Sequence, residues 1–394
     1  MRSLGTIQGG VEEGEIPLTL VWVELTSDST AAGAHVRGTL QRLNDARFRP
    51  SVITQWEDRP TWLPRPARKM WRIASVVARA RLAPARGVLL ARWSPFIALI
   101  SGRWTKRGRP FVLFVQGNLD DMYDSNPWTR RARWLTDLAL SSIREATQVV
   151  TPSEGLAEWV GTLRPDGRTD VTVIPNGADV ALFEQERAKA ARETAGPAHA
   201  LFFGNMARWQ GIDTILDALA DPQWPEDLGL RVIGDGQMAD AVRACGDPRL
   251  TYLGRRTKPE VAAAAARAEI SLATRHDIAA SATGVSPFKI IESAAAGTPT
   301  VVTRVPGQTE LAEDIGGSVL IDAGDAPALA GAVARLHADA DARAALAERG
   351  LAGAARYDWA ARADELTEVV HAAAGLAQPG DGAAGDDRRA AVAS

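Results

Sequence analysis

The chain has 394 residues, more than one hydrophobic core usually organises, so two domains are expected. Its 46% hydrophobic and 24% charged residues are ordinary globular usage and exclude a fibrous chain, and a net charge of -3 gives no reason to expect a nucleic-acid partner. The single cysteine, Cys245, excludes an intrachain disulfide and a cysteine metal site, which favours a reducing, cytoplasmic location.

Residues 1–16 are polar and acidic, and we expect them to form a flexible leader and not a signal peptide. No uninterrupted apolar run in the sequence reaches the length that spans a bilayer. From residue 17 to 180, six apolar runs alternate with helical patterns, which predicts a parallel sheet with helices on both faces and thus a first α/β domain. The six runs are LTLVWVEL, SVITQW, GVLLAR, FVLFVQG, TQVVTP and VTVIP.

The alternation breaks near Pro175, and the polar, alanine-rich residues 181–198 are predicted to be the interdomain linker. Six further runs in residues 199–355 predict a second doubly wound α/β domain. Residues 356–375 are predicted to form a helix that crosses back to the first domain, and residues 376–394 a disordered tail. The six runs are ALFFG, LGLRVIGDG, RLTYLG, EISLAT, TPTVVT and GSVLID.

Open α/β sheets bind ligands at the carboxyl ends of their strands, so functional side chains are expected there. The segment TGVSPFKIIESAAAGTPTVVT, residues 283–303, has the most informative pattern. Ser286 is the predicted N-cap of a helix with Pro287 at its first position, and the free N–H groups of such a helix end bind phosphate. Lys289 adds a positive charge in the first turn. Glu292 lies about 4.5 Å deeper on the same face, the step from a diphosphate to its ribose.

Lys289 and Glu292 have an alternative interpretation as an exposed ion pair on the helix surface, worth about 0.2–0.5 kcal/mol. Their apolar neighbours Phe288, Ile290 and Ile291 leave little of this helix to face water. A buried glutamate needs a partner, so the neighbours favour a ligand site.

SPFKIIESAAAGTPTVV resembles the donor-binding helix of retaining GT-B glycosyltransferases related to glycogen and sucrose synthases, the family 4-like enzymes, in an S-P-x-K variant. Six more segments resemble the same family in the expected order. The resemblance implies a GT-B fold, in which two doubly wound Rossmann-like domains face each other across a cleft. The six segments are TAAGAHVRGTL, VVTPSEGLAEWV, IPNGADVALF, LFFGNMARWQGIDTILDAL, VIGDGQMADAV and LTYLGRRTKPEVAAAAARAEISLAT.

The resemblance implies roles for individual residues of the donor site. Arg208 would reach the donor diphosphate, and Glu292 would hold the ribose. Gly33 and Ala34 would let the backbone of the first domain approach the donor phosphates closely. The remaining implied contacts are the loop Gly254, Arg255 and Arg256 beside the base, Ser286 and Lys289 at the phosphates, and His35 facing donor or acceptor.

Three positions depart from the family pattern. Gln210 stands where the family usually has a lysine, Gly284 where it has a sugar-binding glutamate, and Gln116 where it commonly has a histidine. Lys289 can restore the missing positive charge, and Asp277 is the candidate to replace the missing carboxylate.

The resulting prediction is a retaining, metal-independent glycosyltransferase that needs no cofactor. It would move a sugar from a nucleotide diphosphate sugar, with UDP favoured by family frequency, to a hydroxyl of a glycan, lipid-linked or small-molecule acceptor. Arg208 and Lys289 are the predicted catalytic residues, because the leaving diphosphate gains negative charge that preorganised cations stabilise. The donor phosphate oxygen would receive the acceptor proton, so no general base is assigned.

Two other functions remain open. Gly234 to Ala239 reads G-x-G-x-x-A after a predicted strand, and Arg255 with Arg256 could take a 2′-phosphate, as in an NADP-dependent oxidoreductase. The departures at Gln210 and Gly284 motivate a non-catalytic nucleotide-sugar-binding subunit.

Residues 59–86 carry eight Arg or Lys residues and no acidic residue, interleaved with Trp62 and Trp71. As a helix this segment could make a peripheral contact with the inner membrane face and collect a lipid-linked acceptor. The alternative is a solvated basic helix, which the flanking prolines shorten, and a small soluble acceptor is equally open.

Overall fold

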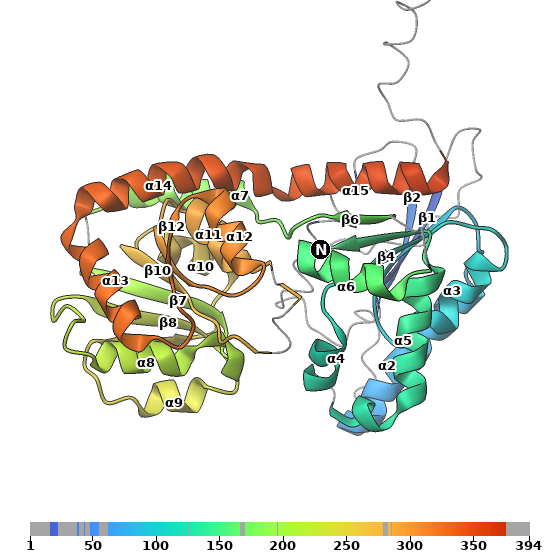
Figure 1. Ribbon diagram of the computed structural model, residues 1–394, viewed down its shortest axis with the longest axis horizontal. Coiled ribbons are helices and arrows are strands. Elements are labelled where there is room, and N and C mark those ends of the chain that lie inside the picture. The colour runs from blue at the N-terminus through green and yellow to red at the C-terminus, as the bar shows by residue number, and fades with distance from the viewer. Residues whose placement is uncertain are drawn as a thin grey trace, which may run out of the picture. The chain divides into compact units, whose positions relative to one another are not determined.

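The computed structural model describes residues 16–22, 38, 43, 48–54, 62–125, 127–165, 170–194, 196–278, 283–284 and 286–375. The chain forms two compact units. Unit 1 comprises residues 1–151, 157–174 and 363–394, and unit 2 comprises residues 152–156 and 175–362 (Figure 1). The predicted tail, residues 376–394, and nearly all of the predicted leader lie outside the described residues.

Unit 1 contains a six-stranded sheet with the order β2-β1-β3-β4-β5-β6, and every neighbouring pair is parallel. The four inner strands are short runs of largely buried residues, mostly branched or aromatic, as parallel strands covered on both faces require, whereas residues 49–52 of the edge strand β2 are exposed. The strands are β1 (Ile16–Trp22), β2 (Phe48–Thr54), β3 (Val88–Arg92), β4 (Phe111–Phe114), β5 (Gln148–Thr151) and β6 (Val171–Val173).

Helices cover both faces of the first sheet. Leu366, Val369 and Val370 of α15 join the core formed by β1, β3, β4 and β5 on one face. On the other face α2, α3 and α5 pack against one another in that order, as right-handed crossovers running one way along the sheet require (Figure 1). The helices described with this unit are α2 (Arg65–Leu82), α3 (Ala98–Thr105), α4 (Leu119–Ser125), α5 (Arg133–Glu145), α6 (Glu154–Leu163) and α15 (Trp359–Ala374).

Unit 2 contains a second six-stranded parallel sheet with the order β12-β11-β10-β7-β8-β9. The chain runs outward from β7 to β8 and β9, then returns to the other side of β7 to add β10, β11 and β12. The order therefore reverses between β7 and β10. The strands are β7 (His199–Asn205), β8 (Gly229–Asp235), β9 (Leu250–Gly254), β10 (Ile270–Ala273), β11 (Thr300–Thr303) and β12 (Ser318–Ile321).

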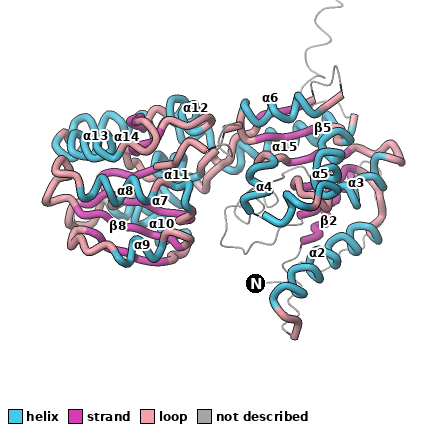
Figure 2. Tube along the Cα trace, turned by 60° about the horizontal axis from the view of Figure 1, so that its bottom comes forward, coloured by secondary structure: helices cyan, strands magenta, loops and turns pink. Residues whose placement is uncertain are grey.

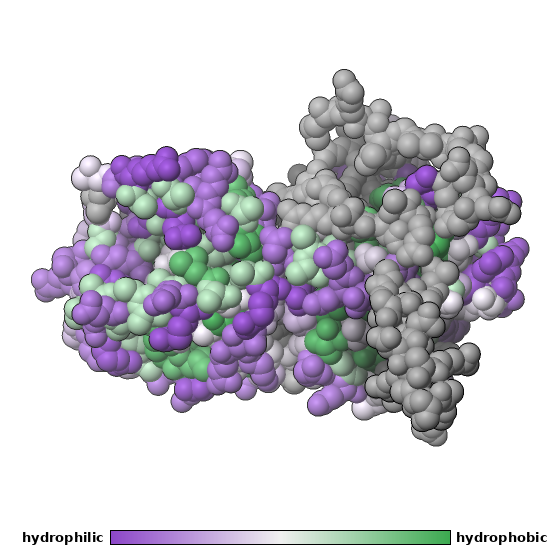
Figure 3. Space-filling view, turned by 90° about the horizontal axis from the view of Figure 1, so that it is seen from above, coloured by the Kyte–Doolittle hydropathy of each residue, from purple (hydrophilic) through white to green (hydrophobic). Residues whose placement is uncertain are grey.

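Alternate residues of β7 face two separate cores on the two sides of this sheet. Phe202 packs with α8, α9 and α13, and Phe203 packs with α7, α10, α11 and α12. Figure 2 shows the strands of unit 2 as a layer between these helices, and Figure 3 shows a largely hydrophilic surface with scattered hydrophobic residues over the same unit. The helices are α7 (Val180–Ala190), α8 (Ile212–Ala220), α9 (Ala239–Ala244), α10 (Lys258–Ala265), α11 (Phe288–Ala295), α12 (Gln308–Ile315), α13 (Ala326–Ala338) and α14 (Ala340–Ala354).

All twelve apolar runs coincide with strands, but the predicted linker differs from the structure. Residues 181–198 belong to unit 2, where α7 buries Val180 and Phe183 against α10 and α11. The division between the units falls at Pro175, at the end of the first sheet. Among the described residues, no helix is both long enough and apolar enough to cross a membrane.

The glycines of the G-x-G-x-x-A segment serve packing within unit 2. A Cβ on Gly234 would lie 1.9 Å from the carbonyl oxygen of Gly204, and one on Gly236 would lie 2.8 Å from Met206. Both glycines have a positive φ. The backbones also bond directly, because the Met206 amide donates to the Asp235 carbonyl at 3.0 Å. The segment thus supports the loop after β7, and its glycines need no dinucleotide to explain them.

We predict that Gly234→Ala destabilises the chain by about 2 kcal/mol or more, because the backbone is in a region that alanine avoids and the carbonyl of Gly204 must move. The thermal midpoint of unfolding should fall by several degrees. Gly246→Ala is the matched control, since a Cβ there has open space. Equal melting temperatures for the two variants would contradict this packing role.

Candidate active site

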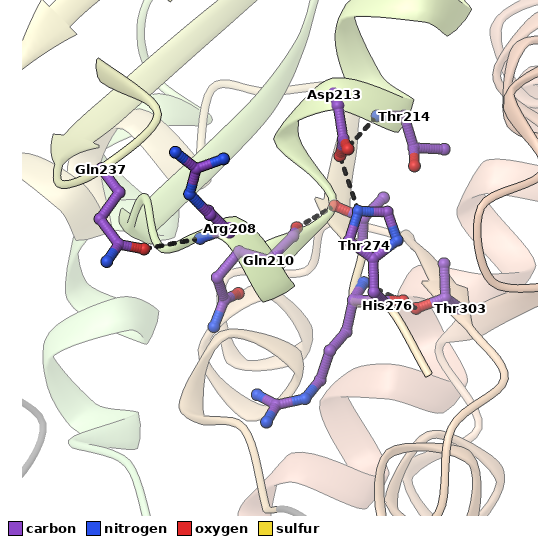
Figure 4. Close-up of polar contacts among 9 residues, drawn as sticks. Arg208, Gln210, Asp213, Thr214, Gln237, Thr274, His276 and Thr303 are labelled. Carbon is purple, nitrogen blue, oxygen red and sulfur yellow. Dashed lines mark hydrogen bonds and ion pairs between the residues drawn. The ribbon is translucent and has the colours of Figure 1, made fainter. Parts of the chain in front are cut away.

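The loops after β7 and β10 meet where the strand order of the second sheet reverses. Such a reversal opens a crevice at the carboxyl ends of the strands, where doubly wound sheets bind ligands. The Thr274 hydroxyl donates a hydrogen bond to the Gln210 carbonyl at 2.7 Å (Figure 4). The His276 amide donates to the Trp209 carbonyl at 2.9 Å. The two loops are therefore held together as one structure beside the crevice.

Further polar contacts fix this pair of loops to the body of unit 2. The His276 ring contacts Asp213 at 2.8 Å, at the start of α8 (Figure 4). Thr303, at the end of β11, accepts from the Arg275 amide at 2.8 Å and donates to the Arg275 carbonyl at 3.0 Å. Gly211 has φ +63°, and a Cβ there would lie 3.0 Å from Thr274. The close approach of the loops thus depends on a glycine.

Lys289 places its ammonium group beneath these loops. The side chain extends from the first turn of α11, and the residue is only 9% exposed. Its Nζ donates to Oε1 of Gln210 at 3.1 Å and lies 3.8 Å from the ring centroid of Phe202. The end of β7 also lies beside the ammonium group, since a Cβ on Gly204 would lie 3.9 Å from this Nζ. Lys289 thus contacts the side chain of Gln210, which stands where the family usually has a lysine.

Burial, together with the nearby Arg275 guanidinium, lowers the pKa of Lys289 from 10.5 to about 7, and Glu292 partly opposes this shift. Its hydrogen-bond acceptor, Gln210, is neutral. The ammonium group is therefore incompletely compensated in the free chain, and an anion in the crevice would favour its protonated form.

Glu292 has an ionic partner that the sequence did not reveal. Its carboxylate, in a residue 4% exposed, pairs with the Nζ of Lys258, the first residue of α10. Because Lys289 and Glu292 are both buried, the alternative of an exposed ion pair between them is wrong. Lys258 follows the loop predicted to border the base, but its contact with a residue 34 positions away needs the tertiary fold.

Ser286 is not the N-cap of α11, which differs from the prediction. The helix begins at Phe288, with Pro287 in the capping position and no side-chain cap. The Ser286 hydroxyl instead accepts a hydrogen bond from the Asn176 amide at 3.0 Å, and the Asn176 side chain donates to the Ser286 carbonyl at 2.6 Å. The segment before α11 is thus hydrogen-bonded to residues 174–177, and the Ser286 hydroxyl binds Asn176 and not the first turn of the helix.

Gly284 adopts a conformation that a glutamate would avoid. Its φ is +81°, and a Cβ there would lie 3.0 Å from the hydroxyl oxygen of Ser153. That hydroxyl donates to the Thr283 carbonyl at 3.0 Å, which holds the turn in place. The family's usual glutamate therefore does not fit this backbone. Asp277 is exposed on the loop after β10.

The other predicted residues lie at varied places. Arg208 is exposed at the start of the 3-10 helix Arg208–Gln210, where its amide bonds to the Gln237 side chain at 3.3 Å (Figure 4). Gly254 ends β9, and Arg255 pairs with Asp235 at 3.1 Å on the surface, which holds the pKa of Asp235 below its ordinary value. Gln116 follows β4 in unit 1, and Gly33, Ala34 and His35 lie outside the described residues.

The structure thus brings together one cluster in unit 2, formed by the Arg208–Gln210 loop, Lys289, Glu292 and Lys258. The described residues contain no group of three or more histidine, cysteine or acidic side chains arranged to hold a metal ion.

We predict that Lys289→Met stabilises the ligand-free chain, by about 1–4 kcal/mol at pH 6.5. The pKa of Lys289 is lower in the folded chain than in the unfolded one, so its buried charge costs stability fully below about pH 7. That cost declines as the pH rises toward 10.5, where the side chain is neutral in both states. Urea midpoints should therefore differ more at pH 6.5 than at pH 9.5.

The matched control is Lys189→Met, at an exposed lysine of α7 that pairs with Glu186. A stability gain in Lys289→Met that does not change with pH, or a loss at pH 6.5, would contradict the assignment of a buried, poorly compensated charge.

Comparison with known proteins relates both halves of the chain to one class of enzyme. Residues 197–339 match the family model described as "Glycosyl transferases group 1", and residues 32–182 match the model described as "Glycosyltransferase Family 4". The D-inositol 3-phosphate glycosyltransferase of Corynebacterium kroppenstedtii is 31% identical over 221 residues, which cover 50% of this chain and 47% of that protein. Glycogen synthase of Mycobacterium tuberculosis is 28% identical over 242 residues, covering 59% and 55%. The chain spans about half the length of the curated relatives it matches.

Solved structures show a similar fold over nearly the whole chain. Sucrose-phosphate synthase from Thermosynechococcus elongatus has a TM-score of 0.70 at 17% identity and covers 91% of this chain and 99% of its own. Anabaena HepE in complex with UDP-glucose has a TM-score of 0.67 at 17% identity and covers 91% and 100%. The chain therefore has the two-domain GT-B fold, and its two halves match the models of group 1 and family 4 glycosyltransferases.

Proposed function

We propose that the chain transfers a sugar from a nucleoside diphosphate sugar to an acceptor hydroxyl, with retention of anomeric configuration and without a metal ion. The UDP-sugar is the favoured donor, because HepE, which shares the fold, was crystallised with UDP and with UDP-glucose. The family matches of both halves support the reaction class.

One observation carries this proposal. A lysine ammonium is buried where the strand order reverses, beside a helix N-terminus, and its acceptor is a neutral amide. Arg275 lies close enough to oppose its charge, and Arg208 begins the loop that contains Gln210. A site built in this way gains most when a diphosphate enters, since the anion removes a charge cost that is present without it.

In the proposed reaction the bond between C1 of the sugar and the diphosphate oxygen breaks. The acceptor oxygen forms its bond to the same face of C1, and its proton passes to a phosphate oxygen of the departing nucleotide. Lys289, Arg208 and the first N–H groups of α11 stabilise the charge that grows on that leaving group. Glu292 accepts hydrogen bonds from the ribose hydroxyls, and Lys258 pairs with its carboxylate.

The other predicted contacts belong to this proposal as well. Gly33 and Ala34 let the backbone approach the phosphates, Gly254 and Arg255 border the base, and Ser286 shapes the turn before α11 through Asn176. The sugar or acceptor contacts are His35, Gln116 and Asp277. The acceptor is a glycan, lipid-linked or small-molecule hydroxyl. The chain works in the cytoplasm, and residues 59–86 contact the inner membrane face.

A non-catalytic nucleotide-sugar-binding subunit is the second candidate, because Gly284 excludes the family's usual sugar-binding glutamate. Both candidates predict that UDP raises the thermal midpoint. Only the enzyme releases UDP from a UDP-sugar when the purified chain is incubated alone or with an acceptor. UDP binding without release or transfer would select the second candidate.

We predict that Lys289→Ala lowers the turnover number at least about 10²-fold, because it removes a charge aimed at the leaving group. UDP release from the UDP-sugar is the measurement, and circular dichroism reports whether the fold is intact. Lys189→Ala, at an exposed lysine of α7, should retain the wild-type rate. A wild-type rate in Lys289→Ala would remove this lysine from the mechanism.

We also predict that UDP binds more weakly as the pH rises from 7.5 to 8.5. The pKa of Lys289 is about 7 in the free chain, so most of the free lysine is neutral in this range and must take up a proton to pair with the diphosphate. The dissociation constant should rise by up to about tenfold per pH unit, as measured by calorimetry in buffers of different ionisation enthalpy. Lys289→Met should bind weakly with no such slope, and a wild-type slope in that variant would assign the proton to another group.

A further inference from the structure

Unit 1 contains a long stretch of one charge sign. Between residues 59 and 119 the sequence has 13 Arg or Lys residues and no Asp or Glu. This stretch includes all of α2, β3, α3 and β4. A chain with net charge -3 therefore separates its charges strongly, and the helices α2 and α3, which pack together, belong to its most basic part.

Helix α2 has apolar residues on two opposite faces. Ile73, Val76 and Ala80 are buried and follow helical spacing, so they form the face toward the sheet. A second stripe is exposed to solvent and is spaced by four residues, with one tryptophan beside it. It consists of Met70, Trp71, Ala74, Ala78 and Leu82. The side chain of Met70 is 56% exposed and that of Leu82 is 82% exposed, so packing within unit 1 does not account for these apolar residues.

Arginines flank this exposed stripe. Arg68, Arg72 and Arg79 recur at helical spacing between the buried face and the stripe, and each is half buried. Arg81 and Arg86 are exposed near the C-terminal end of the helix. The exposed Arg81 and Arg86 thus place positive charge beside the apolar stripe, as in interfacial helices.

Exposed apolar side chains concentrate in the same part of the molecule. Among the described residues, seven large hydrophobic side chains are exposed, and six of them lie between residues 62 and 134. They are Trp62, Met70, Trp71, Leu82, Leu99 and Trp134. Leu99 is on α3 and Trp134 is on α5, the two helices that continue the layer from α2. A concentration of this kind marks an interaction surface.

We infer that the exposed stripe of α2 docks on an anionic lipid bilayer, with the stripe in the interface and the flanking arginines at the headgroups. Charge selects this partner. A second copy of the chain would bring two basic, acid-free helices together, whereas a surface of anionic headgroups complements them. Tryptophan, methionine and leucine supply the apolar area that such a surface accepts. Docking on a bilayer does not require sugar transfer. Only the idea that docking brings the chain to a lipid-linked acceptor rests on the proposed function.

Co-sedimentation with vesicles tests this inference. The full chain should bind vesicles containing 30% phosphatidylglycerol in phosphatidylcholine at about 50 mM salt, lose most binding at about 500 mM salt, and bind pure phosphatidylcholine at least about tenfold more weakly. The variant Met70→Ser, Trp71→Ser, Leu82→Ser should bind the anionic vesicles at least about tenfold more weakly than the wild type. Val52→Ser, at an exposed site on β2, and Arg243→Gln, at an exposed arginine of α9, are the matched controls.

Three results would overturn the inference. The first is that the triple variant binds vesicles as the wild type does and has an unchanged melting temperature. The second is equal binding of the wild type to neutral and anionic vesicles. The third is that the wild type binds no vesicles and is a dimer in light scattering, whereas the triple variant is a monomer. The thermal shift caused by UDP is measured on the same samples. Vesicle binding without that shift would refute the proposed donor while leaving docking in place, and the shift without vesicle binding would do the reverse.

Discussion

The burial of one ammonium group constrains the rest of the candidate site. Lys289 extends from α11, and its hydrogen-bond acceptor is a neutral glutamine on the loop after β7. The ring of Phe202 and the carboxylate of Glu292 offset part of the cost of removing the charge from water, and Arg275 adds to that cost. A folded chain tolerates such a group when binding recovers the energy. The buried charge therefore raises the free energy of the ligand-free site, and the binding of an anion would remove part of that cost.

Glu292 shows how the same region keeps its charges apart. Its carboxylate pairs with Lys258 of α10, while Lys289 of the same helix turns to Gln210 on the other side. The two lysines thus have different hydrogen-bond partners. The loops that organise this arrangement are held by side chain to backbone hydrogen bonds from Thr274 and Thr303 and by the close approach at Gly211. Loops that are held by such contacts position charges in advance, so less reorganisation would accompany the binding of a ligand.

Much of the fold could be predicted from the sequence, because parallel strands buried on both faces appear as short apolar runs and all twelve runs became strands. The linker could not, because the polar residues of α7 conceal two positions, Val180 and Phe183, that pack into unit 2. The cap of α11 was wrong for a similar reason, since the Ser286 hydroxyl bonds to Asn176, 110 residues away. The positions of Lys289 and Glu292 followed from local spacing, whereas the Lys258 contact depends on the packing of α10 against α11. Local pattern therefore placed both residues on one helix, and tertiary contacts decided their partners.

The two departures from the family pattern have different physical origins. At Gln210 the charge is relocated, because the Lys289 ammonium contacts the side chain that stands in the usual lysine's place. At Gly284 the missing carboxylate is excluded by the backbone, because φ is +81° and Ser153 lies against the turn. In the proposed reaction, a relocated cation can still face the leaving diphosphate. In the same proposal the sugar loses the contact with that carboxylate, so selectivity for the sugar must come from other side chains, and the exposed Asp277 on the loop after β10 is the candidate. The donor's nucleotide end is thus expected to dominate its recognition.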